Sequence, residues 1–74
     1  MDSNVKRLVA LKPETVIRRE AAARAKLAEM QRRQLAAEER RDYVFAAQWS
    51  QLARTTAVEL NYLVAARQIQ SWAR

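Results

Sequence analysis

The chain has 74 residues, of which 50% are hydrophobic and 30% are charged, and its formal net charge is +6. It contains no glycine, cysteine or histidine, and Pro13 is its single proline. This composition excludes a disulfide framework and a thiolate metal site, and it disfavours folds that depend on tight turns. A chain of this size buries only about 60% of its unfolded surface, so we expect a partner chain to supply further stability.

Residues 1–12 are predicted to form a short N-terminal head. Ser3 or Asn4 is the expected cap of one or two helical turns. Lys12 ends the head, because a residue that precedes a proline is disfavoured in the α conformation.

Two long helices are predicted to follow, over residues 13–41 and 42–73. Pro13 suits the first position of a helix, and the residues after it are mostly strong helix formers. Asp42 is the only good N-cap in the middle of the chain. We therefore expect an all-α protein whose two helices form an antiparallel hairpin. The alternative is one continuous helix of about 90 Å, because no glycine or asparagine marks the break.

The first long helix has two apolar lines on its helical wheel. One line contains Val16, Ala23, Leu27, Met30 and Ala37, and the other contains Ile17, Ala21, Ala28 and Leu35. Both lines consist largely of small residues. This helix can therefore approach a neighbour closely, but it supplies little apolar area.

The second long helix is apolar nearly all around. Of the 31 positions from 43 to 73, nineteen are apolar or aromatic, and only Arg54, Glu59 and Arg67 are charged. Such a helix is buried on more than one side, and one neighbour built largely from alanine cannot cover it. We expect it to bind another protein chain, either a second copy or a different protein. The predicted partner-binding residues are Phe45, Trp49, Leu52, Val58, Leu60, Tyr62, Leu63, Ile69 and Trp72.

The positive charge is concentrated in the first half of the chain. Residues 1–41 carry 11 basic and 6 acidic groups, whereas residues 42–74 carry 3 and 2. A basic helix can bind the phosphates of nucleic acid, and the candidates for that role are Arg18, Arg19, Arg32 and Arg33. The competing interpretation is a solvated helix with pairs such as Glu29–Arg33 at the stabilising i,i+4 spacing. We favour the solvated helix, because no aromatic residue lies among these arginines.

Catalysis is not expected. The adjacent carboxylates Glu38 and Glu39 point in different directions on a helix and do not form an acid–base pair. We predict no cofactor, no metal and no small-molecule substrate. Glu59 lies near the apolar surface of the second helix and is a candidate for pairing with an arginine of the first helix or with a partner, or else for a position at the rim. Arg67 is a candidate for a buried or specificity-setting charge.

No run of about 18 apolar residues is present, so no transmembrane segment is predicted. The apolar run from Leu8 to Leu11 is too short for the core of a signal peptide. We therefore expect a location in the cytoplasm or within a larger assembly.

One short segment resembles the centre of a UVR motif, a helical hairpin that makes protein–protein contacts. The segment is Ala36-Ala37-Glu38-Glu39-Arg40-Arg41-Asp42-Tyr43-Val44-Phe45-Ala46-Ala47. The turn of the motif carries an acidic–aromatic pair followed by two alanines, so the resemblance implies a turn at Asp42 and Tyr43. Trp49, Ser50 and Gln51 replace the Arg-Asp pair that the motif carries a few residues later. The resemblance is therefore one of hairpin turns and not of family membership.

The size of the chain and its aromatic second helix also look like the small co-chaperones of type III secretion needle subunits. The sequence thus predicts a non-enzymatic interaction module, such as an accessory or assembly subunit or a co-chaperone, that docks through its second helix. The alternative function is nucleic-acid binding through the basic first helix on a dimeric helical core.

Overall fold

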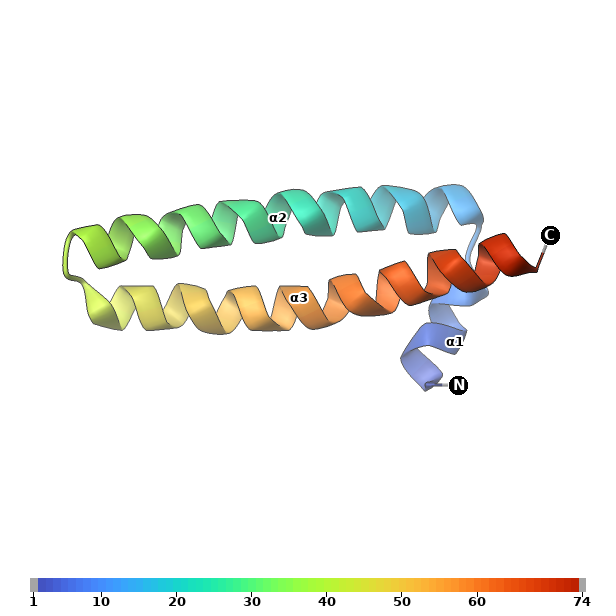
Figure 1. Ribbon diagram of the computed structural model, residues 1–74. Helices are drawn as coiled ribbons and strands as arrows, with labels where there is room; N and C mark the ends of the chain where they lie inside the picture. The colour runs from blue at the N-terminus through green and yellow to red at the C-terminus, as the bar shows by residue number, and fades with distance from the viewer. Residues whose placement is uncertain (1, 74) are drawn as a thin grey trace.

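The structure is a computed structural model that describes residues 2–73, and within that range it consists of three α-helices. They are α1 (Ser3–Val9), α2 (Pro13–Glu39) and α3 (Tyr43–Trp72). The two long helices lie side by side and antiparallel, and α1 crosses α3 at the end remote from the turn (Figure 1). The predicted hairpin with a short head is confirmed, and the alternative of one continuous helix is wrong.

The two long helices begin where the sequence predicts. Pro13 occupies the start of α2, with Glu14 in the first turn. Asp42 caps α3, and its side-chain oxygen accepts a hydrogen bond from the backbone N–H of Phe45 at 3.1 Å. The Asp42 cap satisfies a backbone group that a helix end leaves unpaired, whereas α2 begins without a side-chain cap and with a proline that has no N–H to satisfy.

The cap of α1 differs from the expected Ser3 or Asn4. Asp2 takes this role, and its carboxylate accepts a hydrogen bond from the backbone N–H of Asn4 at 2.8 Å. Aspartate, serine and asparagine cap helices about equally well. Cap preference alone therefore could not place the start of α1 among three consecutive candidates.

The turn between α2 and α3 is closed by hydrogen bonds of the Schellman type. The backbone N–H of Asp42 donates to the carbonyl of Ala37 at 2.9 Å, and that of Arg41 donates to Glu38 at 3.0 Å. This motif needs a left-handed residue, usually glycine, just after the helix. Arg41 takes that conformation here, with φ of 60°, so the chain breaks its helix without a glycine.

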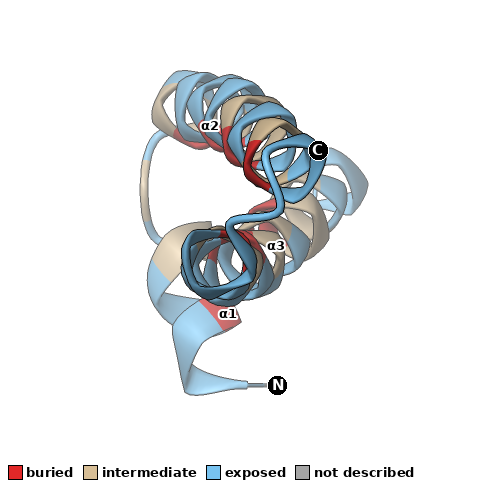
Figure 2. Ribbon diagram, turned by 90° about the vertical axis from the view of Figure 1, so that its left-hand side faces the viewer, coloured by how far each residue is buried: buried red, intermediate tan, exposed pale blue. Residues whose placement is uncertain are grey.

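The long helices meet along a seam in which contacting positions alternate in spacing by three and four residues. On α2 the seam runs along Val16, Glu20, Ala23, Leu27, Met30, Gln34 and Ala37. On α3 it runs along Ala46, Trp49, Ala53, Thr56, Leu60, Leu63, Arg67 and Gln70. All of these residues are buried or half-buried, and Figure 2 shows the buried positions of the long helices where they face each other. This spacing is the heptad pattern of a coiled-coil seam.

The predicted apolar lines of α2 separate cleanly in the structure. The line that contains Val16, Ala23 and Met30 faces α3 and is buried. The second line stays at the surface, where Ile17 and Leu35 are exposed. Small seam residues such as Ala37 and Ala46 allow the two helices to approach closely near the turn.

The head packs mainly against α3 and only marginally against α2. Val5 is buried and belongs to the same apolar cluster as Leu63 and Ala66 of α3. Gln70 holds the end of the head, because its side-chain amide donates to the carbonyls of Val9 and Leu11 at 3.1 and 2.8 Å. The head therefore covers the part of α3 near its C-terminal end.

The molecule is elongated, with Cα extents of 49 × 20 × 14 Å and a radius of gyration of 15.0 Å. A compact domain of this length has a radius of gyration of about 11 Å. Across residues 2–73, none of the helices is both long enough and apolar enough to traverse a lipid bilayer.

Candidate interaction surface

The side of α3 that points away from α2 forms a second regular line, which we call the outer face. Its positions also alternate in spacing by three and four residues. The outer face therefore rotates around the helix axis by the same angle per heptad as the seam, and the two stay on opposite sides of α3. None of its members is charged. The outer face consists of Val44, Gln48, Gln51, Thr55, Val58, Tyr62, Ala65, Ile69 and Trp72.

The head divides the outer face into a covered part and a bare part. Tyr62, Ala65 and Ile69 are half-buried and pack with the core cluster around Val5. From Val44 to Val58 every member of the outer face is exposed. Val44 keeps 74% of its surface exposed and Val58 keeps 51%. In Figure 1 no other part of the chain lies against α3 between the turn and α1 on this side.

The nine predicted partner-binding residues occupy three different places. Trp49, Leu60 and Leu63 lie in the seam, and Leu63 is only 1% exposed. Leu63 therefore belongs to the core of the chain itself and is not presented at the surface of this conformation.

The other six predicted residues lie at or near the surface. Phe45 and Leu52 are exposed on the flank of α3 between the seam and the outer face. The remaining four, Val58, Tyr62, Ile69 and Trp72, belong to the outer face itself.

A row of stacked side chains from both long helices, Phe45, Trp49 and Arg33, flanks this surface near the turn. The rings of Phe45 and Trp49 lie 6.1 Å apart between centroids. The guanidinium carbon of Arg33 lies 5.2 Å from the centroid of the Trp49 ring, within the range of a cation–π contact. Arg33 thereby joins α2 to an aromatic pair on α3 and shields one side of Trp49.

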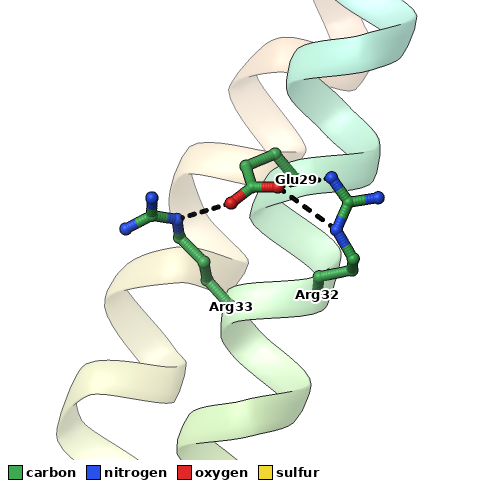
Figure 3. A network of polar contacts seen from close by, with 3 residues as sticks. All are labelled: Glu29, Arg32 and Arg33. Carbon is green, nitrogen blue, oxygen red and sulfur yellow. Dashed lines mark hydrogen bonds and ion pairs between the residues drawn. The ribbon is translucent and has the colours of Figure 1, made fainter.

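Glu29 holds Arg33 of this row and the neighbouring Arg32 in place (Figure 3). One carboxylate oxygen accepts a hydrogen bond from Arg33 Nε at 2.9 Å, and the other accepts hydrogen bonds from the guanidinium of Arg32. The hydrogen bonds from Arg32 and Arg33 hold the pKa of the Glu29 carboxyl below its ordinary value. Two of the four predicted phosphate-binding arginines are thus engaged within the chain.

The other two predicted phosphate-binding residues, Arg18 and Arg19, are exposed and form no ion pair within the described residues. The i,i+4 pairing expected for a solvated helix is present for Glu20–Arg24, at 3.5 Å, and for Glu29–Arg33. The structure therefore does not bring the four predicted arginines together as one set of free cations.

One ion pair crosses the seam. Arg67 Nε donates to Glu20 Oε1 at 2.7 Å, and the Glu20 side chain is only 13% exposed. The hydrogen bond from Arg67 lowers the pKa of the Glu20 carboxyl, and Arg24 adds to this effect against the opposing effect of burial. Arg67, which the sequence marks as a candidate buried charge, pairs with Glu20 of α2. Glu59, the candidate for cross-helix pairing, is exposed.

A hollow of about 460 Å³ lies where the head meets the bare part of the outer face. Its apolar lining includes Leu8 and Leu11 from the head and its linker, and Val58 and Tyr62 from α3. Arg7 and Glu59 stand at the same hollow. We call this feature the notch.

Gln70 is a structural residue that the sequence did not reveal. Its side-chain amide clamps the head through two backbone carbonyls, and a glutamine on a helix carries no local signal for such a contact. Thr56 is similar, because it is buried in the seam with its hydroxyl 3.3 Å from the sulfur of Met30. Ala46 and Ala53 lie seven residues apart and Thr56 follows three residues later, which is the spacing of a seam, but residues this small or polar give no apolar signal that would locate it.

Among the residues described, no group of three or more potential metal-ligating side chains is found. Comparisons with protein-family models, with curated proteins and with solved structures find no match for the chain.

Proposed function

We propose that the chain is a non-enzymatic protein–protein interaction module that docks through α3. Its role would be that of a small accessory or assembly subunit or of a co-chaperone. The observation that supports this proposal is the bare part of the outer face, from Val44 to Val58, together with the exposed flank residues Phe45 and Leu52. Val44, Phe45, Leu52 and Val58 are large apolar residues that stay exposed along this stretch, and exposed apolar side chains gathered on one surface mark interaction sites in soluble proteins.

The arrangement of charge supports docking through α3 instead of α2. Exposed arginines surround α2, whereas Arg54 and Glu59 are the only charged residues of α3 between its start and the half-buried part of the outer face. The core of an interface is depleted in charged residues and enriched in aromatic ones. On α3 itself, residues 43–53 include three aromatic residues, Tyr43, Phe45 and Trp49, and no charged one.

Site-specific photo-crosslinking in the native cells tests this proposal. A photoreactive amino acid is placed at Gln48 on the outer face and, as the matched control, at Gln31, which is exposed on α2. We expect one or a few discrete crosslinked products from position 48 and none from position 31. Equal product patterns from the two positions, or no product from position 48, would contradict the proposal.

Nucleic-acid binding is the second candidate function, and the free guanidinium groups of Arg18 and Arg19 favour it. Its affinity should fall steeply with salt concentration, because each neutralised phosphate releases a counterion. The test is a titration of the chain with duplex DNA and with RNA at low and moderate salt. Binding that persists after Arg18→Gln and Arg19→Gln would exclude these two residues as the phosphate contacts.

A further inference from the structure

We propose that a second copy of this chain occupies the bare part of the outer face, antiparallel to the first and related to it by a two-fold axis near Gln51. This inference rests on the proposed function and names its partner. In this pairing Val44 of each copy packs against Val58 of the other. The turn end of each hairpin, with Tyr43 and Val44, enters the notch of the other copy.

The bare part of the outer face has the symmetry that such a pairing requires. Its five positions are Val44, Gln48, Gln51, Thr55 and Val58. Read in either direction, the line has an apolar branched residue at each end and uncharged polar residues in the middle. A two-fold interface places the same patch on both partners, so each patch must complement itself in the reversed direction.

The head and the notch define the limits of this pairing. The head covers the outer face from Tyr62 to Ile69, so the uninterrupted stretch of α3 that a second helix can lie against runs between the turn and Val58. The notch is the hollow at that limit, and Val58 lines it. A reversed second copy brings its exposed Tyr43 and Val44 to this position, and both are apolar enough to fill it.

The exposed area of the chain agrees with one such interface. A compact monomer of 8.6 kDa exposes about 4,700 Å². This chain exposes 5576 Å², which exceeds the compact value by about 900 Å². A standard protein–protein interface buries about 800 Å² on each partner, so the extra surface of this elongated chain is similar in size to one such contact.

The charges favour a second copy over an acidic partner. An acidic partner would be drawn to α2 and the head, because residues 1–41 carry a net charge of +5 and residues 42–74 only +1. Pairing through the uncharged outer face keeps the two basic α2 helices on opposite sides of the dimer. At the notch, Arg7 and Arg19 are accompanied by Glu59, and the turn end that enters it carries Glu38, Glu39 and Asp42 beside Arg40 and Arg41, so charges of both signs meet there.

Disulfide trapping tests the proposed face directly, because the natural chain contains no cysteine. Gln51→Cys places a thiol beside the two-fold axis, and Gln31→Cys is the matched control on α2. Under mild oxidation we expect near-complete disulfide-linked dimer from the first variant and only a minor fraction from the second. Equal yields from the two variants would overturn the proposal, and circular dichroism verifies that both variants stay helical.

Sedimentation equilibrium tests the register. We expect a dimer. Val44→Glu and Val58→Lys should each raise its dissociation constant about tenfold or more, because each leaves an unpaired charge in the contact. The double variant with Val44→Glu and Val58→Lys should recover most of the lost dimer affinity, because the antiparallel register pairs each introduced carboxylate with an introduced ammonium group of the other copy. A double variant no better than the single variants, or a monomer up to about 1 mM, would overturn the proposal.

The mass of the crosslinked product from position 48 separates this inference from the proposed function. A product of twice the mass of the chain supports both. A discrete product of any other mass keeps the interaction module and overturns the second copy as its partner. The absence of a product overturns both.

Discussion

Arg41 holds the conformation on which the hairpin depends. Its φ of 60° places an ordinary side chain in the left-handed region, where the Cβ atom approaches the following carbonyl and costs about 1–2 kcal/mol. The Schellman hydrogen bonds from Asp42 and Arg41, together with the packing of the two long helices, outweigh this cost. The turn is thus specified by its capping groups and by the seam, and not by a turn-forming residue.

Replacing Arg41 by glycine should stabilise the chain. Glycine adopts positive φ without the steric penalty, although it loses more backbone entropy on folding, so Arg41→Gly should raise the free energy of unfolding by about 0.5–1 kcal/mol. Urea unfolding followed by circular dichroism measures this change. Arg40→Gly is the matched control, because Arg40 has a φ of −84°. That control should destabilise the chain, and a gain equal to that of Arg41→Gly would contradict the explanation.

The Glu20–Arg67 pair should make stability depend on pH in the acid range. Because the folded chain holds the pKa of Glu20 below its ordinary value of 4.5, the unfolded chain binds more protons in acid. The contribution is therefore present above about pH 5 and is lost as the pH falls through the lowered pKa. Arg67→Gln should reduce the loss of unfolding free energy between about pH 5 and pH 3.

Thermal unfolding at a series of pH values measures this dependence for the Arg67→Gln variant. Arg54→Gln is the matched control, because Arg54 is an exposed arginine of the same helix that forms no ion pair within the described residues. At neutral pH we expect Arg67→Gln to cost about 1 kcal/mol, since Arg67 is 40% exposed and solvent weakens the pair. An Arg54→Gln variant with the same flattened profile would show that the pair is not the cause.

At the scale of the elements, the head is the least independent part of the fold. A seven-residue helix is too short to be stable alone, so α1 depends on the burial of Val5 and on the hydrogen bonds from Gln70. It covers the portion of the outer face from Tyr62 to Ile69. Its position therefore decides how much of α3 a partner can reach.

Placing a charge at Val5 should release the head and leave the hairpin intact. Val5→Asp buries a carboxylate in the apolar cluster, so α1 should undock at a cost of about 1–2 kcal/mol. Limited trypsin digestion should then cleave after Arg7 markedly faster, while total helicity changes little. Asn4→Asp is the control on the exposed side of α1. Unchanged cleavage of Val5→Asp would contradict the view that Val5 anchors the head.

The helices were predictable from the sequence because helix propensity, Pro13 and the Asp42 cap all agree on them. The choice between a hairpin and a single rod was not predictable from the turn residue itself, since an arginine such as Arg41 carries no signal for positive φ. The seam was predictable on α2, where Val16 and Met30 mark it. It was not predictable on α3, where alanine, threonine, arginine and glutamine occupy most of its positions and larger apolar residues lie elsewhere.

The candidate site was predictable only in part, because the sequence marks it through apolar residues alone. Apolarity singled out Val58, Tyr62, Ile69 and Trp72, which the structure places on the outer face. Apolarity also selected Leu60 and Leu63, which pack in the seam, because size and hydrophobicity do not distinguish one buried side of a helix from the other. The uncharged polar members Gln48, Gln51 and Thr55 carried no apolar signal, although they lie on the same line.

At the scale of the whole molecule, stability and association should be coupled. A dimer that forms only between folded chains stabilises the folded state, and each tenfold increase in concentration adds about 1.4 kcal/mol per dimer once the chain is mostly dimeric. The unfolding midpoint of the natural chain should therefore rise with concentration. Val58→Glu should make the unfolding midpoint independent of protein concentration. Arg18→Gln is the control, and its midpoint should still rise with concentration. A natural chain whose midpoint is constant across concentrations would contradict this expectation.

The head and the C-terminal end of α3 lie at the same pole of the molecule, opposite the turn (Figure 1). In the proposed pairing about Gln51, these poles point in opposite directions and lie roughly 60 Å apart along the paired helices. A gene fusion that joins two copies through a linker shorter than about 20 residues could not span that separation. Such a tandem protein would bridge to its neighbours and grow into open filaments, whereas a longer tether would let it fold back into a closed, soluble unit.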